Sequence, residues 1–496
     1  MNSILLKIKQ FLGSPLFFWT VIGLFVFQAL WLVSSALYPM AFDEAYHFSF
    51  IQVYSQQWSP FITEHPSYAN HLGVVTRDTS YFFHYLMSFP YRLITVFTDN
   101  QIAQIIILRI INVGFFAASL LLFRRAFRQL NLSSALTNVG LLLFTLIPIT
   151  PLLAAHISYD NLLILLISAL FYLSIKVIQR LQNSELDLLS LLGVIILIAF
   201  AGVVKQAALP IGLTAVLFIA SYGGYAFRGQ SLSGFSQEIG LRWRGISSLL
   251  RVPLIVLLIL GSGLFIERYG INLIRYGATA PGCEEVLTFE QCMETGPFER
   301  TYQYAQNPVP GFSPSFSDHS SRWIGGMWYR TFFMINGDVP IDRYHNFPPL
   351  PLPALGATAI FIAGIVAAII YAKQIFRRPE MVFLALAALF YATVIWYLNY
   401  TGSYNYTGRV AGANGRYLLI VALPLIAVLG AALTKLLQRF DRLKVVAVVV
   451  VSLAMMNGGG VMSFWYRSSD TWYWDNPLVE SMNQSAQRVV SPFIVE

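Results

Sequence analysis

Charged residues are scarce in this chain, and that scarcity defines its class. Only 11% of the 496 residues are Asp, Glu, Lys or Arg, whereas 56% are hydrophobic and the mean hydropathy is +0.61. Soluble domains contain roughly 25% charged residues. The composition therefore excludes a soluble globular protein and predicts an all-α, polytopic membrane protein.

Several motifs of other protein classes are missing as well. No Gly-rich phosphate loop follows a strand pattern, no cysteine spacing matches a zinc site, and no internal repeat is visible. The net charge of +8 does not indicate a nucleic acid partner, because the basic residues gather on short segments between apolar runs. We expect neither a nucleotide-sugar domain nor nucleic acid binding.

Cysteine is nearly absent too. The two cysteines, Cys283 and Cys292, fall in one long segment between apolar runs, 269–353, which we expect outside the cytoplasm. An extracytoplasmic compartment permits disulfides, so a bond that closes a short loop is predicted. Two free thiols are the alternative.

Long apolar runs dominate what is present. Eleven runs of roughly 17–23 residues predict spanning helices, and we treat 1–496 as a single transmembrane domain. The first run is too long for a cleaved signal peptide, and the seventh is expected to continue past Glu267 and Arg268. The predicted spans are 16–38, 101–123, 136–155, 161–178, 188–204, 207–227, 252–266, 355–371, 381–398, 417–433 and 445–464.

The basic residues orient these spans. With the N-terminus in the cytoplasm, the short inner segments hold 18 of the 32 Lys and Arg residues but only five acidic ones. This positive-inside pattern places the C-terminus outside. The outer regions are then 39–100, with interfacial helices over 45–53 and 81–97, the loop 269–353 and the tail 465–496.

Two adjacent carboxylates, Asp43 and Glu44, open the first outer region. Carboxylates beside a bilayer are costly unless they meet water, cations or substrate, which favours a functional role. The alternative is that they cap a short surface helix, with His47 as a partner one turn later.

Ionisable residues within or beside the spans are further candidates. Arg109 lies inside the second span and needs a partner, although snorkelling to the headgroups is an alternative. Asp160 stands at the outer start of the fourth span, where it either caps the helix or takes part in chemistry.

Two cations are expected on the same outer face. Lys205 lies in a tight turn where the positive-inside rule disfavours a lysine, so it either holds an anion or snorkels. Arg416 stands at an outer helix N-terminus, where a bound anion would relieve its unfavourable interaction with the helix dipole.

The sequence leaves open whether a metal ion is bound. All seven histidines, His65 in the first outer region among them, fall on the predicted outer side. Asp43 and Glu44 could hold a divalent cation such as Mg²⁺ or Mn²⁺ together with some of these, but the spacing matches no defined site.

Three stretches carry a family resemblance: 42–48 (FDEAYHF), 205–210 (KQAALP) and 415–419 (GRYLL). Together with the long first outer region and the many spans, they resemble the GT-C superfamily of integral-membrane glycosyltransferases, and a bacterial branch of it most. The soluble C-terminal domain of some members has no counterpart here.

The resemblance implies a hexosyl or pentosyl transferase of the bacterial plasma membrane with an extracytoplasmic active site. The donor would be a polyprenyl-phosphate sugar, the acceptor a lipid, glycan or protein, and the reaction inverting. Asp43 would be the general base, Glu44 would support it or help hold a metal, and Lys205 and Arg416 would hold the donor phosphate. His47, Asp160, Arg109 and His65 are supporting candidates. A lipid-linked glycan flippase or transporter, or a structural subunit of an envelope complex, are the alternatives.

Overall fold

Eight helical stretches of the computed structural model are long and apolar enough to cross a membrane. The structure describes residues 2–41, 43–229, 231–332, 349–438 and 440–495, and within these ranges it contains helices and no strand. The eight stretches are α2 (Pro15–Ser35), α5 (Gln101–Gln129), α8 (Tyr159–Gln182), η2 with α10 (Gln206–Ala226), α12 to α13 (Ser248–Tyr276), α18 (Pro351–Ile370), α20 to α21 (Pro379–Thr407) and η6 with α22 (Gly415–Leu436).

The other three predicted spans correspond to shorter helices, so the count of eleven remains a prediction. The fifth is α9 (Leu188–Val204). The third, expected as one helix over 136–155, is broken into α6 (Ser134–Thr145) and α7 (Ile149–Ala154). Pro148 lies at this break, because a proline cannot donate the hydrogen bond that would continue α6.

The eleventh predicted span, 445–464, is also broken. It forms α23 (Asp441–Met456) and α24 (Met462–Arg467). Between them Gly458 and Gly460 adopt positive φ values of 96° and 57°. Glycine enters this left-handed region without steric cost, so the chain turns here instead of continuing as a helix.

The seventh span continues past Glu267 and Arg268, as the sequence predicts. A π-helical turn, η3 (Ile266–Gly270), joins α12 (Ser248–Phe265) to α13 (Ile271–Tyr276). Such turns are frequent at specialised positions in helices. Here the turn presents Glu267 to Arg77, with 3.3 Å between their charged atoms, and thereby ties α12 to the first outer region.

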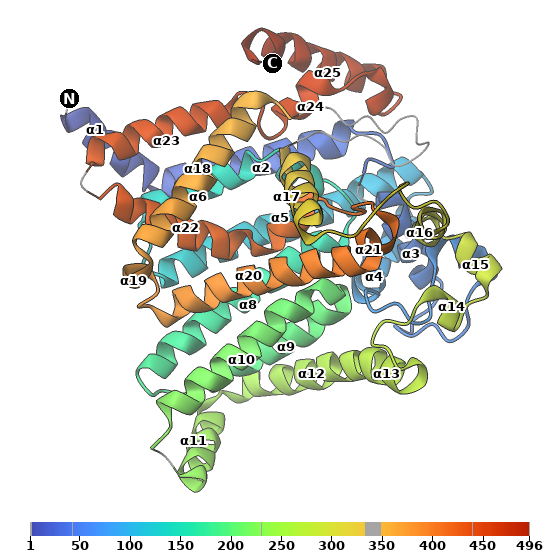
Figure 1. Cartoon of the computed structure of the whole chain (residues 1–496), viewed down its shortest axis with the longest axis horizontal. Coiled ribbons are helices and arrows are strands. Elements are labelled where there is room, and N and C mark those ends of the chain that lie inside the picture. The colour runs from blue at the N-terminus through green and yellow to red at the C-terminus, as the bar shows by residue number, and fades with distance from the viewer. Residues whose placement is uncertain (1, 42, 230, 333–348, 439, 496) are drawn as a thin grey trace.

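Helix α8 forms the centre of the bundle. About two thirds of its apolar window (67%) is buried, against 6% for the stretch that contains α12. It packs against α5 and α9, and Figure 1 shows the long helices lying side by side around it. Residues at the ends of α8 are therefore surrounded by several helices.

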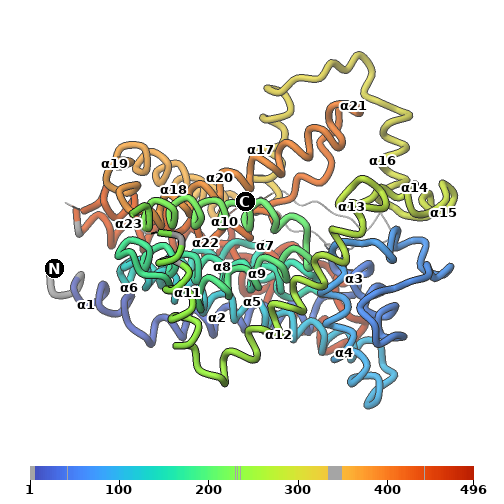
Figure 2. The backbone as a smooth tube through the Cα atoms, turned by 90° about the horizontal axis from the view of Figure 1, so that it is seen from below, coloured from blue at the N-terminus to red at the C-terminus, as the bar shows by residue number. Residues whose placement is uncertain are grey.

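Two groups of shorter helices mark opposite ends of the bundle. The helices α3 (Glu44–Ser55) and α4 (Phe82–Phe97), both expected from the sequence, gather with α14 (Cys283–Val286), α15 (Phe289–Met293) and α16 (Gly296–Gln306) at one end (Figures 1 and 2). At the other end lie α1 (Asn2–Leu12) and α19 (Ala372–Ile375). The predicted Cys283–Cys292 disulfide is present near α14 and α15, with an S–S distance of 2.04 Å.

The remaining α-helices are α11 (Leu232–Gly245), α17 (Phe316–Phe332) and α25 (Pro477–Val490). In the C-terminal tail, Asn483 of α25 accepts a hydrogen bond of 2.9 Å from the Trp31 indole of α2. The tail is thus packed on the first spanning helix.

Candidate functional site

The adjacent carboxylates Asp43 and Glu44 point to different partners. Asp43 precedes α3 with a φ of 64°, in the left-handed region, and its side chain makes no capping hydrogen bond. Its carboxylate is 58% exposed, whereas that of Glu44 is fully buried. Phe42, the first residue of the quoted motif, lies outside the described residues. The helix-cap alternative therefore fails for the Asp43 side chain.

Glu44 is held by a buried ion pair with Arg109. The Arg109 Nε donates to Glu44 Oε1 and its Nη2 donates to Oε2, both at 2.7 Å. The backbone N–H of Met40 donates to Oε2 at 2.9 Å, and that of Ile157 donates to Oε1 at 3.2 Å. Arg109 thus has the partner that the sequence led us to expect, and it does not snorkel. Glu44 has its acceptor positions filled, which argues against the expected catalytic or metal-binding role.

The ion pair also sets the charge state of Glu44. Burial raises the pKa of a carboxyl group, but the charge and hydrogen bonds of Arg109 outweigh that effect and hold the pKa of Glu44 below its usual value. Arg109 further donates to the carbonyl oxygen of Ala36 at 2.6 Å. Helix α5, the end of α2 and the start of α3 are thus fastened together by one charge pair.

We expect Arg109→Met to destabilise the fold strongly, because it leaves the buried Glu44 carboxylate without its cation. Breaking a buried pair in this way costs about 3–5 kcal/mol. The matched control is Arg125→Met, which changes an exposed arginine of the same helix and should alter stability by less than about 0.5 kcal/mol. Thermal unfolding of the detergent-solubilised variants measures both, and equal melting temperatures would contradict the assigned role of the pair.

Asp43 belongs to a second group of ion pairs. Arg416 Nη2 is 2.7 Å from Asp43 Oδ2, and Arg416 Nε is 3.9 Å from Asp160 Oδ2. Lys205 Nζ is 2.7 Å from Asp160 Oδ1. The four side chains come from the starts of α3, α8 and η6 and from the end of α9, so the fold joins residues that are remote in sequence. We call these four residues the outer ionic cluster.

Burial divides the outer ionic cluster into a fixed part and an open part. Asp160, Lys205 and Arg416 are 1%, 8% and 6% exposed, whereas the Asp43 side chain is largely exposed. Buried charges require partners, and Asp160 lies between the two cations. Lys205 therefore does not snorkel, and Asp160 is an ion-pair partner instead of a cap.

Local sequence explains how these side chains are placed. The N-cap of α8 is Ser158, whose hydroxyl accepts from the Asp160 N–H at 3.2 Å, so the Asp160 carboxylate is free to reach Lys205. Asn414 caps η6 (Gly415–Val421) in the same way, accepting from the Arg416 N–H at 3.0 Å. A Cβ at Gly415 would lie 2.8 Å from the Cα of Thr331, so only glycine permits this close approach of η6 to α17.

Two tyrosines that sequence reasoning missed surround Lys205. Its Nζ lies 4.4 Å from the ring centroid of Tyr159 and 4.8 Å from that of Tyr417. Aromatic faces attract ammonium groups at such distances. The available signal was adjacency, since each tyrosine is the sequence neighbour of a cluster residue, Asp160 or Arg416.

Asn112 is a further residue whose role the sequence did not reveal. Its Oδ1 accepts from the Ser158 N–H at 3.3 Å and from Asn161 Nδ2 at 3.1 Å. These bonds fix the start of α8 against α5. Asn112 therefore positions the turn that carries Asp160.

His47 lies behind the cluster as one half of a buried histidine pair. Its Nδ1 is 2.8 Å from His84 Nε2, and its ring packs edge-on against Tyr159 with 4.4 Å between centroids. Burial lowers the pKa of His47 well below its usual value and lowers that of His84 to about 3. Burial thus favours the neutral form of both rings.

His65 contacts a different residue: its Nε2 lies 3.0 Å from Asn70 Oδ1. Within the described ranges, no group of three or more His, Cys, Asp or Glu side chains is arranged to hold a metal ion. Of the two suggested ligands, Asp43 has an exposed side chain and the Glu44 carboxylate is fully buried against Arg109, so the pair does not fit the suggested Asp43–Glu44 metal site.

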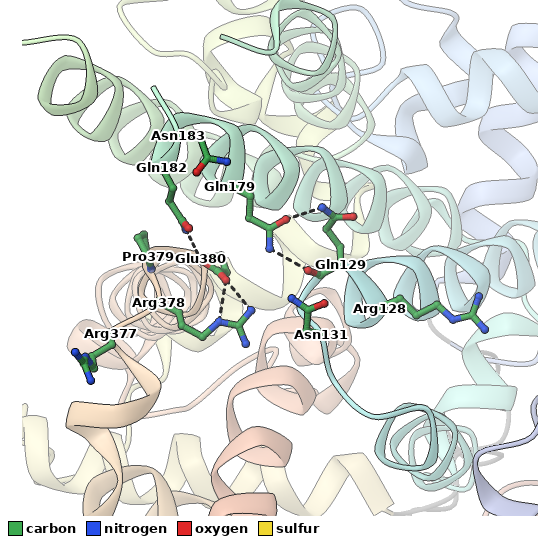
Figure 3. A pocket seen from close by; sticks show the side chains of 10 residues that line it. All are labelled: Arg128, Gln129, Asn131, Gln179, Gln182, Asn183, Arg377, Arg378, Pro379 and Glu380. Atoms are coloured by element: carbon green, nitrogen blue, oxygen red, sulfur yellow. Dashed lines mark hydrogen bonds and ion pairs between the residues drawn. The ribbon is translucent and has the colours of Figure 1, made fainter. Parts of the chain in front are cut away.

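A pocket of about 500 Å³ lies at the opposite end of the bundle, lined by the ends of α5 and α8 and the start of α20 (Pro379–Asn399). In Figure 3, Gln182 and Arg378 both turn toward Glu380. Gln182 Nε2 donates to Glu380 Oε2 at 2.9 Å, and Arg378 Nη2 donates to Glu380 Oε1 at 2.7 Å. Because Asp160 and Gln182 stand at opposite ends of α8, roughly 33 Å separate this pocket from the outer ionic cluster at 1.5 Å per residue. The pocket takes no part in the site.

Taken together, fold and site define an all-helical, multi-pass membrane protein with an ionic cluster at one end of its bundle. No protein-family model matches the chain, and no curated protein matches it significantly.

Among solved structures, the chain is similar to an Archaeoglobus fulgidus oligosaccharyltransferase tethered through a disulfide bond to an acceptor peptide containing the NVT sequon. The identity is 10% and the TM-score is 0.39; the alignment covers 96% of this chain and 59% of that one. This chain thus spans less than two thirds of the length of that protein, and a similarity of this degree carries no argument about function.

Proposed function

We propose that this protein is a GT-C-type membrane glycosyltransferase that moves a sugar from a polyprenyl-phosphate donor to an extracytoplasmic acceptor. One observation carries the proposal: an exposed carboxylate, Asp43, pairs with the nearly buried Arg416, and Arg416 shares the buried Asp160 with a second nearly buried cation, Lys205. A glycosyl transfer from a lipid phosphate needs a base for the acceptor and fixed cations for the leaving group.

The proposed reaction is a single displacement at the anomeric carbon. The acceptor hydroxyl oxygen forms a bond to that carbon while the bond from the carbon to the phosphate oxygen breaks, and its electron pair stays on the phosphate. The acceptor proton passes to Asp43. One displacement inverts the anomeric configuration, and the extra negative charge on the leaving polyprenyl phosphate is stabilised by Lys205 and Arg416.

The placement of the charges supports surface chemistry over transport. The cluster residues stand at the starts of α3, α8 and η6 and at the end of α9, at the end of the bundle that the positive-inside pattern predicts to lie outside. A transporter more often concentrates such groups near the bilayer midplane. The acceptor is proposed only by class: a lipid, a glycan or a protein on the outer face of a bacterial plasma membrane.

Reconstituted vesicles distinguish transfer from flipping. We expect the protein to release polyprenyl phosphate from a polyprenyl-phosphate sugar in the outer-equivalent leaflet when an acceptor mixture is supplied. The control variant Asp99→Asn, which changes an exposed carboxylate after α4, should do the same. Movement of an intact donor between leaflets, without cleavage, would identify a flippase instead.

The same assay tests the cofactor. Because Glu44 is engaged by Arg109 and two backbone N–H groups, we expect EDTA to leave the rate within about twofold of the untreated value, in contrast to the large losses typical when a metal stabilises transition-state charge. A loss that added Mg²⁺ or Mn²⁺ restores would show that a divalent cation acts in the reaction.

A further inference from the structure

The Asp43–Arg416 ion pair occupies the position at which the donor phosphate is proposed to bind. Arg416 is one of the two cations assigned to that phosphate, and its Nη2 is already bonded to Asp43 Oδ2 at 2.7 Å. The Asp43 Oδ2 that accepts this guanidinium N–H is not available to the proton of an acceptor hydroxyl. In the absence of substrate, the proposed base, Asp43, and the proposed phosphate ligand, Arg416, are therefore bonded to each other.

The two carboxylates of the cluster differ in how firmly they are held. Asp160 is 1% exposed and contacts Lys205 at 2.7 Å and Arg416 at 3.9 Å. The Asp43 side chain is largely exposed and is bound to Arg416 through one oxygen, and the backbone of Asp43 has a φ of 64°. Asp43 is thus the member of the cluster that an incoming anion can displace.

We infer that the Asp43–Arg416 pair is an autoinhibitory contact that the donor phosphate opens. The inference rests on the proposed function and adds an order of events to it. The phosphodiester of the donor takes the place of Asp43 on Arg416, and its negative charge repels the carboxylate toward the acceptor side. The cations then face Asp160 and the phosphate, while the released Asp43 accepts the acceptor proton.

The inference predicts ordered binding, in which the donor precedes productive binding of the acceptor. It also predicts a competition between Asp43 and phosphate that requires Arg416. If the pair is closed in about nine molecules out of ten, the apparent affinity for the phosphate is about tenfold weaker than it would be without the pair.

A double-mutant cycle on polyprenyl phosphate binding tests this competition. The four purified proteins are the wild type, Asp43→Asn, Arg416→Gln and the double variant, and the dissociation constant of polyprenyl phosphate is measured for each in detergent. Asp43→Asn should bind about tenfold more tightly than the wild type, and the same change should have no such effect in the Arg416→Gln background. Size-exclusion profiles and melting temperatures confirm that each variant is folded.

Two results would overturn the inference. One is an unchanged or weaker affinity in Asp43→Asn; the other is an equal tightening in both backgrounds, which would show general charge repulsion without a specific pair. These results differ from a failure of the proposed function, which would appear as no binding of polyprenyl phosphate by the wild type or as full transfer activity in Asp43→Asn.

Discussion

Asp43→Asn should abolish sugar transfer while leaving the folded protein intact. The amide keeps the size of the side chain, but it neither carries the charge that pairs with Arg416 nor accepts the acceptor proton. General-base groups contribute on the order of 10²–10⁴-fold to a rate, so the turnover number should decrease by a factor in that range. The melting temperature should stay close to that of the wild type, because the side chain is 58% exposed and caps no helix.

The measurement is the rate of polyprenyl phosphate release by the reconstituted variant under saturating donor. Asp99→Asn is the matched control, since it makes the same chemical change at an exposed aspartate of the same outer region. Turnover by Asp43→Asn at the rate of the control would refute the assignment of the base, whatever else the cluster does.

Loss of the Arg416 or Lys205 charge should weaken donor binding and slow transfer together. Hydrogen bonds to charged groups contribute about 1.5–3 kcal/mol, so Lys205→Gln should lower kcat/KM by roughly 10–150-fold. Arg416→Lys tests geometry: the charge stays, but a lysine lacks the planar fork that reaches Asp43 and Asp160 together. It should retain only part of the activity.

Arg322→Gln is the control for these two variants. It removes a cation from α17 that is 57% exposed and pairs with Asp318 on its own helix, and exposed pairs of this kind contribute little. Donor titrations give KM and kcat for each variant. Wild-type values of KM and kcat in both Lys205→Gln and Arg416→Lys would contradict the assignment of phosphate binding to the cluster.

The apolar pattern predicted where most helices lie, because a membrane helix is specified by a local property of the chain. The sequence also predicted the short helices α3 and α4 and the continuation of α12 into α13. The failures were the breaks inside the third and eleventh spans. Pro148 and the glycines at 458–460 were visible there, but apolar character over 136–155 and 445–464 outweighed them.

The candidate site divides in the same way. Residue type and predicted side selected Asp43, Lys205, Arg416 and Asp160 as members of one face. The ion pairs could not be predicted from the sequence, because Glu44 pairs with Arg109 across 65 residues and Asp43 with Arg416 across 373. Neighbouring carboxylates look equivalent in a sequence, and only packing shows that one is buried against a cation and the other is open.

The most direct test of the whole account is a structure of the protein with a bound polyprenyl-phosphate sugar in a lipid environment. We predict that the phosphate contacts both Lys205 and Arg416 and that the Asp43 carboxylate is turned from Arg416 toward the side from which the acceptor hydroxyl attacks the anomeric carbon. A phosphate bound away from both cations, with the Asp43–Arg416 pair still closed, would contradict the account.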